Sequence, residues 1–173
     1  MKAKLENLWY HYKTIIIVAL VVLAAGAYML SQQLGIPKAD LNVAVVCPEY
    51  VSDEARAALE EALAAAGQDL NGDGRVVVGL RTYQLEVGAD GQDDVAIGSL
   101  DADLVSKYSG LFFLDDPAAL EKATNGLFRA SDAVSVGDWP ALSALPDSAR
   151  YALVRSDGEN SDAYAQMLDK LKG

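Results

Sequence analysis

An uncharged apolar run near the N-terminus sets the strongest limit on what this chain can fold into. Residues 14–30, TIIIVALVVLAAGAYML, contain no acidic or basic side chain. A helix that crosses a membrane needs about 20 apolar residues, within a range of roughly 17 to 25. Aromatic residues cluster immediately before the run and Tyr28 lies near its end, and such side chains favour the headgroup layer. The pattern predicts a transmembrane anchor over residues 14–34.

Two other interpretations of the run are open. The triplet AGA at residues 25–27 fits the small-x-small pattern of a signal-peptide cleavage site, so the segment could be removed. A buried helix of a soluble protein is the second alternative, but the run has no polar face of the kind that a surface helix shows. The aromatic flank and the apolar continuation to Leu30 favour a retained anchor.

The charge is divided unevenly on the two sides of the run. Lys2, Lys4 and Lys13 outnumber Glu6 before it. These are three of 14 basic and one of 25 acidic residues, so the rest of the chain carries 11 bases and 24 acids. Positive charge marks the cytoplasmic side of a membrane segment. The sequence therefore predicts a single-pass cell-membrane protein: a cytoplasmic tail over 1–13, the anchor, a tether over 35–40 and an acidic extracellular domain over 41–173.

The composition argues against several functions. A formal net charge of −11 and a pI near 4.4 argue against nucleic acid as a partner, because phosphate binding depends on lysine and arginine. Cys47 is the one cysteine, so an intramolecular disulfide is impossible. His11 is the one histidine and precedes the anchor. A histidine-based catalytic triad or zinc site in the outer domain is therefore excluded.

Residues 41–173 alternate between strand and helix patterns. Apolar and β-branched runs predict strands, and apolar stripes with capping residues predict helices. Ser52 and Asp116 are suitable N-caps, and Pro117 follows Asp116 at the first helical position. The predicted strands are 41–47, 75–87, 110–116 and 150–156, and the predicted helices are 52–67, 95–107, 116–123 and 159–173. With loops over 125–149, this order predicts an α/β layered domain with a mainly parallel sheet.

A D-x-N-x-D-G loop follows the first predicted helix of this domain. Asp69, Asn71 and Asp73 place side-chain oxygens at alternate positions, and Gly74 allows the chain to turn. Calcium prefers six to eight oxygen ligands, and in such loops the residue after the glycine contributes its backbone carbonyl. That residue is Arg75. The pattern predicts a calcium site; the alternative is a metal-free turn, because Asn-Gly and Asp-Gly pairs are strong turn formers.

The loop lacks one ligand of an EF-hand. The twelfth position, which holds a bidentate glutamate in that motif, is Leu80 here, and a strand follows instead of a helix. The local ligand is therefore missing, which raises the question of which other acid could complete the site. A helix-to-strand loop of a parallel sheet lies where the strands begin, so Asp40, just before the first strand, is the first candidate and Asp103 is another. Other acids end strands and belong to the opposite edge, namely Glu86, Asp115 and Asp116.

Four resemblances support parts of this prediction. The segment DLNGDGRV resembles the calcium loops of dockerins, and the helix, loop and strand together resemble the calcium site of periplasmic galactose-binding proteins, which implies a distant carboxylate ligand. WYHYK, the loop and FFLDD make the chain similar to a group of uncharacterised single-pass membrane-anchored proteins of Gram-positive bacteria. SLDADLVSKYSGLFFLDDP resembles the first lobe of extracellular solute-binding proteins, which implies a one-lobe architecture.

These patterns lead to an expectation about function. We expect a membrane-anchored binding or interaction domain that carries one structural calcium ion, has an unidentified protein partner and is not an enzyme. A ligand-binding accessory lobe of a transporter or sensor is the alternative, and it calls for an apolar hollow near Asp115. A carboxylate-based hydrolase would need two acids that face each other across a cleft. Its candidate acids are the pairs 93–94 and 115–116.

Overall fold

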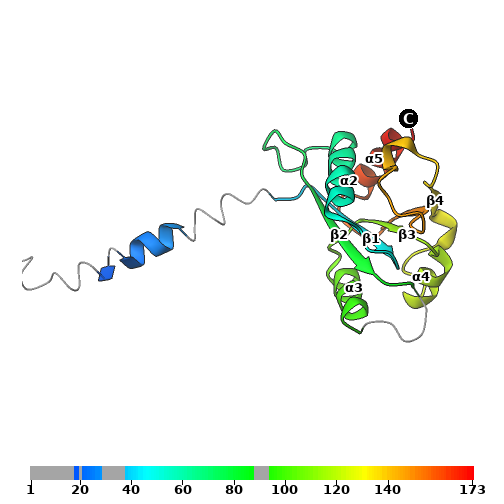
Figure 1. Ribbon diagram of the computed structural model, residues 1–173, viewed down its shortest axis with the longest axis horizontal. Coiled ribbons are helices and arrows are strands. Elements are labelled where there is room, and N and C mark those ends of the chain that lie inside the picture. The colour runs from blue at the N-terminus through cyan, green and yellow to red at the C-terminus, as the bar shows by residue number, and fades with distance from the viewer. Residues whose placement is uncertain (1–17, 20, 29–37, 88–93) are drawn as a thin grey trace, which may run out of the picture. The chain divides into compact units, whose positions relative to one another are not determined.

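The computed structural model describes residues 18–19, 21–28, 38–87 and 94–173 (Figure 1). The chain divides into two compact units, Met1–Pro37 and Lys38–Gly173. In the first unit, residues 18–19 and 21–28 are helical. No helix in the described part of the chain has both the length and the apolar character that a membrane crossing requires. The predicted tail and large parts of the predicted anchor and tether lie outside the described residues.

The second unit is built on a five-stranded sheet with strand order β2-β1-β3-β5-β4. The central strand β1 pairs in parallel with β2 and β3, whereas β5 pairs antiparallel with both β3 and β4. The α/β class is therefore confirmed, and the predicted parallel pairing holds for β1, β2 and β3, but the sheet as a whole is mixed because β5 is antiparallel to both of its neighbours. The strands are β1 Leu41–Cys47, β2 Val78–Gln84, β3 Leu111–Leu114, β4 Val134–Ser135 and β5 Tyr151–Val154.

The short strand β4 explains why the sheet is mixed. The chain leaves β3 through a helix and enters β4, which runs in the same direction as β3. It then turns back, and β5 inserts between β3 and β4 in the opposite direction. A two-residue strand has no sequence periodicity, so the sequence predicted the last strand without the strand that reverses its direction.

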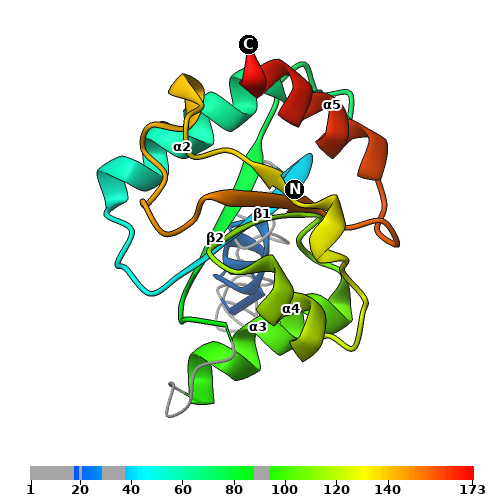
Figure 2. The ribbon, with the colours of Figure 1, turned by 90° about the vertical axis from the view of Figure 1, so that its right-hand side faces the viewer.

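Helices cover both faces of the sheet. Figure 2 shows α2 and α5 on one face and α3 and α4 on the other. The helices are α2 Asp53–Ala66, α3 Asp94–Ser106, α4 Pro117–Ala123 and α5 Ser161–Lys172, with short 3₁₀ turns at Ala130–Asp132 and Pro140–Leu142. Successive side chains of a strand point to opposite faces. Val43 and Phe113 therefore pack in the layer of α2 and α5, and Ala44 and Phe112 pack in the layer of α3 and α4.

Two helix starts follow the capping chemistry that the sequence predicts. Ser52 Oγ accepts a hydrogen bond from the Ala55 N–H at 3.2 Å, and α2 begins at the next residue. The Asp116 carboxylate accepts the N–H groups of Ala118 and Ala119 at 2.9 and 3.1 Å, and α4 begins directly after it. Both side chains satisfy backbone donors that a first helical turn leaves unpaired.

Candidate metal centre

The D-x-N-x-D-G loop lies between α2 and β2, at the end of the sheet where β1 and β2 begin (Figure 1). Its entry is fixed by the Gly67 N–H, which donates to the Leu63 carbonyl at the end of α2. Its exit is fixed by the parallel pairing of Val78 with Leu41. The Asp40 N–H donates to the Val77 carbonyl at 2.8 Å. The fold therefore brings Asp40 to the loop, as the topological argument expects.

Asp69 holds the turn of the loop closed. Its Oδ1 accepts the Gly72 N–H at 2.6 Å and its Oδ2 accepts the Gly74 N–H at 2.8 Å. Both glycines have positive φ angles, +75° and +82°, which residues with a Cβ rarely adopt. The sequence N-G-D-G thus places glycine at the two positions where this turn requires it.

Asn71 and Asp73 repeat this arrangement further along the loop. Asn71 Oδ1 accepts the Asp73 N–H at 2.8 Å, and Asp73 Oδ1 accepts the Arg75 N–H at 2.9 Å. All three alternate side chains therefore turn back toward the backbone of their own loop. Two carboxylates and one amide oxygen therefore accept backbone N–H groups of the same loop, which ends at the residue whose carbonyl is the fourth predicted ligand.

Asp40 accepts hydrogen bonds from the loop with both of its carboxylate oxygens. Its Oδ1 accepts the N–H groups of Leu70 and Asn71 at 2.9 and 3.0 Å, and its Oδ2 accepts the Val77 N–H at 2.9 Å. Asp40 is only 8% exposed. Burial acts to raise the pKa of this carboxyl, but the backbone hydrogen bonds, that of Val77 first, outweigh it and hold the pKa below its ordinary value. Asp40 is therefore an ionised anchor of the loop.

The metal-ligand assignments stay predictions. Among the described residues, no group of three or more His, Cys, Asp or Glu side chains is placed to hold a metal ion. Asp40, Asp69 and Asp73 of the predicted ligand set are three such side chains, so they are not placed together as a ready-made metal site. Asn71 would contribute an amide oxygen and Arg75 a backbone carbonyl oxygen, which are calcium ligands but not acids.

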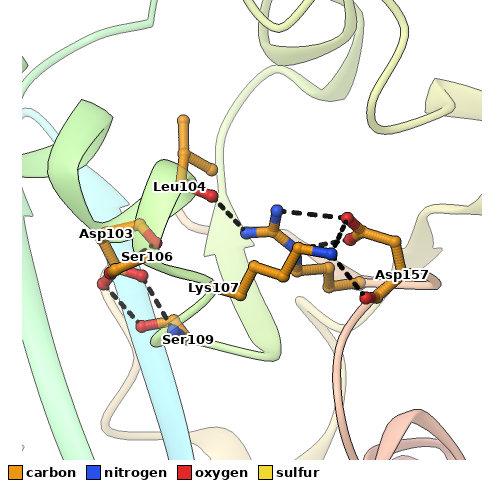
Figure 3. Close-up of polar contacts among 7 residues, drawn as sticks. Asp103, Leu104, Ser106, Lys107, Ser109 and Asp157 are labelled. Atoms are coloured by element: carbon orange, nitrogen blue, oxygen red, sulfur yellow. Dashed lines mark hydrogen bonds and ion pairs between the residues drawn. The ribbon is translucent and has the colours of Figure 1, made fainter.

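Asp103, the second candidate for the distant ligand, has other partners. It is 1% exposed, and its Oδ2 accepts the Tyr83 hydroxyl at 2.6 Å and the Ser109 hydroxyl at 2.7 Å. Its Oδ1 accepts the Ser109 N–H at 2.8 Å (Figure 3). Burial and the hydrogen bond to Asp103 raise the pKa of Tyr83 to about 12. Asp103 therefore fixes the C-terminal end of α3.

A second polar cluster, which sequence reasoning missed, joins α3 to the segment after β5. Arg155 is 2% exposed; its Nη1 donates to the Leu104 carbonyl at 2.8 Å and its Nε pairs with Asp157 at 2.5 Å. Lys107 Nζ lies 2.9 Å from the same carboxylate (Figure 3). The hydrogen bonds from Arg155 and then Lys107 lower the pKa of Asp157 to about 2. This cluster is an anchor of the fold.

Two hollows bear on the expected binding function. A polar hollow of about 630 Å³ lies beside Asp40, and Lys107, Asp157 and Tyr164 contribute to its lining. An apolar hollow of about 200 Å³ lies beyond the end of β2, between α3 and α4. Its apolar lining consists of Leu85, Val87, Ile97, Leu100, Leu104, Leu120 and Ala123. Asp115 does not belong to this lining, so the apolar hollow differs in position from the one that the accessory-lobe alternative calls for.

The acid pairs of the hydrolase alternative can be followed in part. Asp115 Oδ1 accepts the Asp116 N–H at 2.7 Å, while Asp116 caps α4. Both carboxylates therefore have local structural roles. In the other pair, Asp93 lies outside the described residues.

Comparison of the chain with protein-family models, curated proteins and solved structures gave no match. The fold and the site together define the class: an α/β domain with a mixed sheet and a D-x-N-x-D-G loop tied to a buried aspartate. The resemblances of the loop and of the whole chain stay predictions.

Proposed function

We propose that residues 41–173 form an extracellular binding or interaction domain, held to the cell membrane by residues 14–34 and stabilised by one calcium ion in the loop. The membrane part of this proposal is supported by the apolar run with its aromatic and basic flank. The calcium part is supported by one observation. Asp69, Asn71 and Asp73 all turn their oxygens into the same turn of chain.

The loop offers a ligand set that suits calcium. Asp69 and Asp73 contribute carboxylate oxygens, Asn71 an amide oxygen and Arg75 a backbone carbonyl, and water can complete a shell of six to eight oxygens. Asp40 is the candidate for the distant ligand. An ionised carboxylate has about four lone-pair sites, and backbone N–H groups occupy three of those of Asp40. One site is left for the ion.

The ion would stabilise the fold and would not act as a switch. Calcium sensors respond because a helix next to the loop swings outward. Here the loop leads into β2, which pairs with β1 along its whole length. It starts from α2, whose Leu59 and Leu63 are fully buried. Neither neighbour is free to swing.

We expect binding rather than catalysis from this domain. Asp103, Asp115 and Asp116 accept hydrogen bonds that fix helix ends and turns, which suits structural acids. The accessory lobe is a second candidate: the apolar hollow does not include Asp115 in its lining, but it lies beyond the carboxyl end of β2, and ligands of open α/β sheets bind outside the carboxyl ends of the strands. A small apolar ligand would suit its lining.

Thermal unfolding of the full chain, in calcium and in chelator, tests the calcium site. At a calcium concentration one hundred times Kd, a single site adds about 2.7 kcal/mol, which is roughly 5 to 10 °C in Tm for a domain of this size. Asp73→Ala should abolish the rise. Asp138→Ala, at an exposed acid outside the loop, should keep it. Equal Tm values in calcium and chelator would show that the loop is a metal-free turn.

A further inference from the structure

The loop contains an Asn-Gly pair of residues, a sequence that is prone to chemical modification. Asn71 is followed by Gly72, and both are exposed. Because glycine has no Cβ, its backbone nitrogen can approach the preceding side chain closely. The described residues include a second such step, Asn125–Gly126, which is also exposed and whose glycine also has a positive φ, +80° against +75° at Gly72. The two steps can therefore be compared within one chain.

The two steps differ in what holds the glycine nitrogen. The Gly126 N–H donates to the backbone carbonyl of Glu121 at 2.9 Å, in the turn that ends α4. Releasing this nitrogen therefore requires the helix end to open. The Gly72 N–H instead donates to the Asp69 carboxylate at 2.6 Å. Asp69 is exposed, so a rotation of one side chain releases the nitrogen, and the carboxylate is placed to accept its proton.

The reacting amide of Asn71 is also loosely held. Its Nδ2 donates to the Lys38 carbonyl at 3.3 Å, which is beyond the usual range of a strong N–H···O bond. Its Oδ1 accepts the Asp73 N–H at 2.8 Å, and this bond withdraws electron density from the amide carbon. The leaving nitrogen therefore faces solvent with one weak partner, while the carbon next to it is polarised.

We propose that Asn71 is a self-modification site, which deamidates when the loop is empty. The Gly72 nitrogen attacks Cγ of Asn71, its proton passes to Asp69 and from there through water to Nδ2, and the bond from Cγ to Nδ2 breaks with release of ammonia. The product is a cyclic imide. Water opens the imide at Cγ to give aspartate, or at the backbone carbonyl carbon of residue 71 to give isoaspartate.

The two products act on the loop in opposite ways. Aspartate at position 71 adds a third carboxylate to the alternating ligands. Isoaspartate inserts one extra carbon into the backbone and destroys the alternation. Bound calcium would hold Asn71 Oδ1 and Asp69 in place, so that Asp69 could no longer accept the proton. A loop with calcium is therefore protected from deamidation, whereas a loop without calcium is deamidated over time. This last step rests on the proposed calcium site.

Peptide mass spectrometry of the full chain tests the proposal. The protein is incubated in mildly alkaline buffer, with calcium or with chelator, and conversion is followed at Asn71 and Asn125. In chelator, Asn71 is expected to react about fivefold faster than Asn125. This corresponds to about 1 kcal/mol for the backbone hydrogen bond that Gly126 has to break, because the exposed Gly72 N–H and Asp69 carboxylate can exchange their bond for bonds to water. Calcium should slow Asn71 and leave Asn125 unchanged. In concentrated urea both steps should react at similar rates.

Each result separates the modification from the metal. If Asn71 in chelator is deamidated at the same rate as Asn125 or more slowly, the proposal that Asn71 is a modification site is refuted. If calcium raises the Tm but does not change the rate of deamidation at Asn71, the protection of Asn71 by bound calcium is refuted. The proposed function is then unaffected. Equal Tm values in calcium and chelator, together with fast reaction at Asn71, would refute the calcium site and support the modification site.

Discussion

Replacement of Asp40 by alanine tests how the loop is held to the sheet. The carboxylate accepts three backbone N–H groups and is 8% exposed. A hydrogen bond to a charged group contributes about 1.5 to 3 kcal/mol. Leu70 and Asn71 are exposed, so their N–H groups can bind water after the change, while Val77 is half-buried. We count the hydrogen bond from Val77 at its full value and those from Leu70 and Asn71 at a small part of theirs. The free energy of unfolding should then fall by about 3 kcal/mol.

The loss is measured as a change in unfolding free energy by urea titration in the presence of chelator, so that metal binding does not contribute. About 3 kcal/mol corresponds to roughly 10 °C in Tm for a domain of this size. Asp40→Asn should lie between wild type and Asp40→Ala. Its amide oxygen can serve the donors at Leu70 and Asn71, but its NH₂ group would face the Val77 N–H. Asp138→Ala is the control at an exposed acid.

The pH dependence gives a second test of the same contact. The pKa of Asp40 is lowered in the folded state from an ordinary value of 3.8, so its stabilising effect is present above that value and is lost as the pH falls through the lower folded pKa. The gap between wild type and Asp40→Ala should therefore narrow below about pH 4. Ordinary surface substitutions change the unfolding free energy by up to about 0.5 kcal/mol. A difference between wild type and Asp40→Ala below that value at neutral pH would refute the anchoring of the loop by Asp40.

Two further changes test the packing and the charge cluster. A Cβ at Gly110 would lie 2.1 Å from Cε2 of Tyr164, so Gly110→Ala should lower the unfolding free energy by about 1 to 3 kcal/mol in urea titration. Gly98 is an exposed position of α3 with nothing within 4 Å of a Cβ, so Gly98→Ala should raise the unfolding free energy by up to about 1 kcal/mol. Equal effects of the two changes would contradict the close packing at Gly110. Hydrogen bonds from Arg155 and then Lys107 lower the pKa of Asp157 to about 2. The stability advantage of wild type over Asp157→Asn should therefore be present above pH 3.8 and be lost as the pH falls through about 2. Thermal melts across that range check this, and an advantage that persists unchanged at its acid end would contradict the ion pair.

Elements with local signals could be predicted from the sequence. The apolar run 41–47 is β1, and Ser52 and Asp116 cap α2 and α4 as expected. These signals are contained in a few neighbouring residues. The predicted strand over 75–87 shortens to Val78–Gln84, because the Val77 N–H is taken by Asp40 before the strand begins and pairing with β1 ends at Gln84.

Long-range pairing could not be predicted in the same way. Residues 150–156 have the composition of a strand, but the direction of β5 depends on a two-residue strand, β4, whose side chains are exposed. The cluster around Arg155 was missed for a related reason. Arg155 lies at the end of a strand, two residues before an aspartate. Its structural role can be recognised only when the fold brings the Leu104 carbonyl within hydrogen-bond distance of its side chain.

The approach of Asp40 to the loop was predictable, whereas the way it binds was not. Its position follows from the parallel pairing of two strands that begin at the same edge. Its partners are backbone N–H groups, and every residue except proline has one. The identities of residues 70, 71 and 77 therefore carry no signal for these hydrogen bonds.

The amide at position 71 limits the negative charge that the loop carries without an ion. Asp69 and Asp73 accept N–H groups within the loop and Asp40 accepts N–H groups of the same loop, although the three carboxylates do not form one group. A fourth would add repulsion between like charges, which an empty loop has no cation to offset. Asparagine keeps the oxygen ligand without the charge, but next to Gly72 it also provides the reactive amide. The residue that lets the empty loop fold is thus the residue through which the empty loop can be modified.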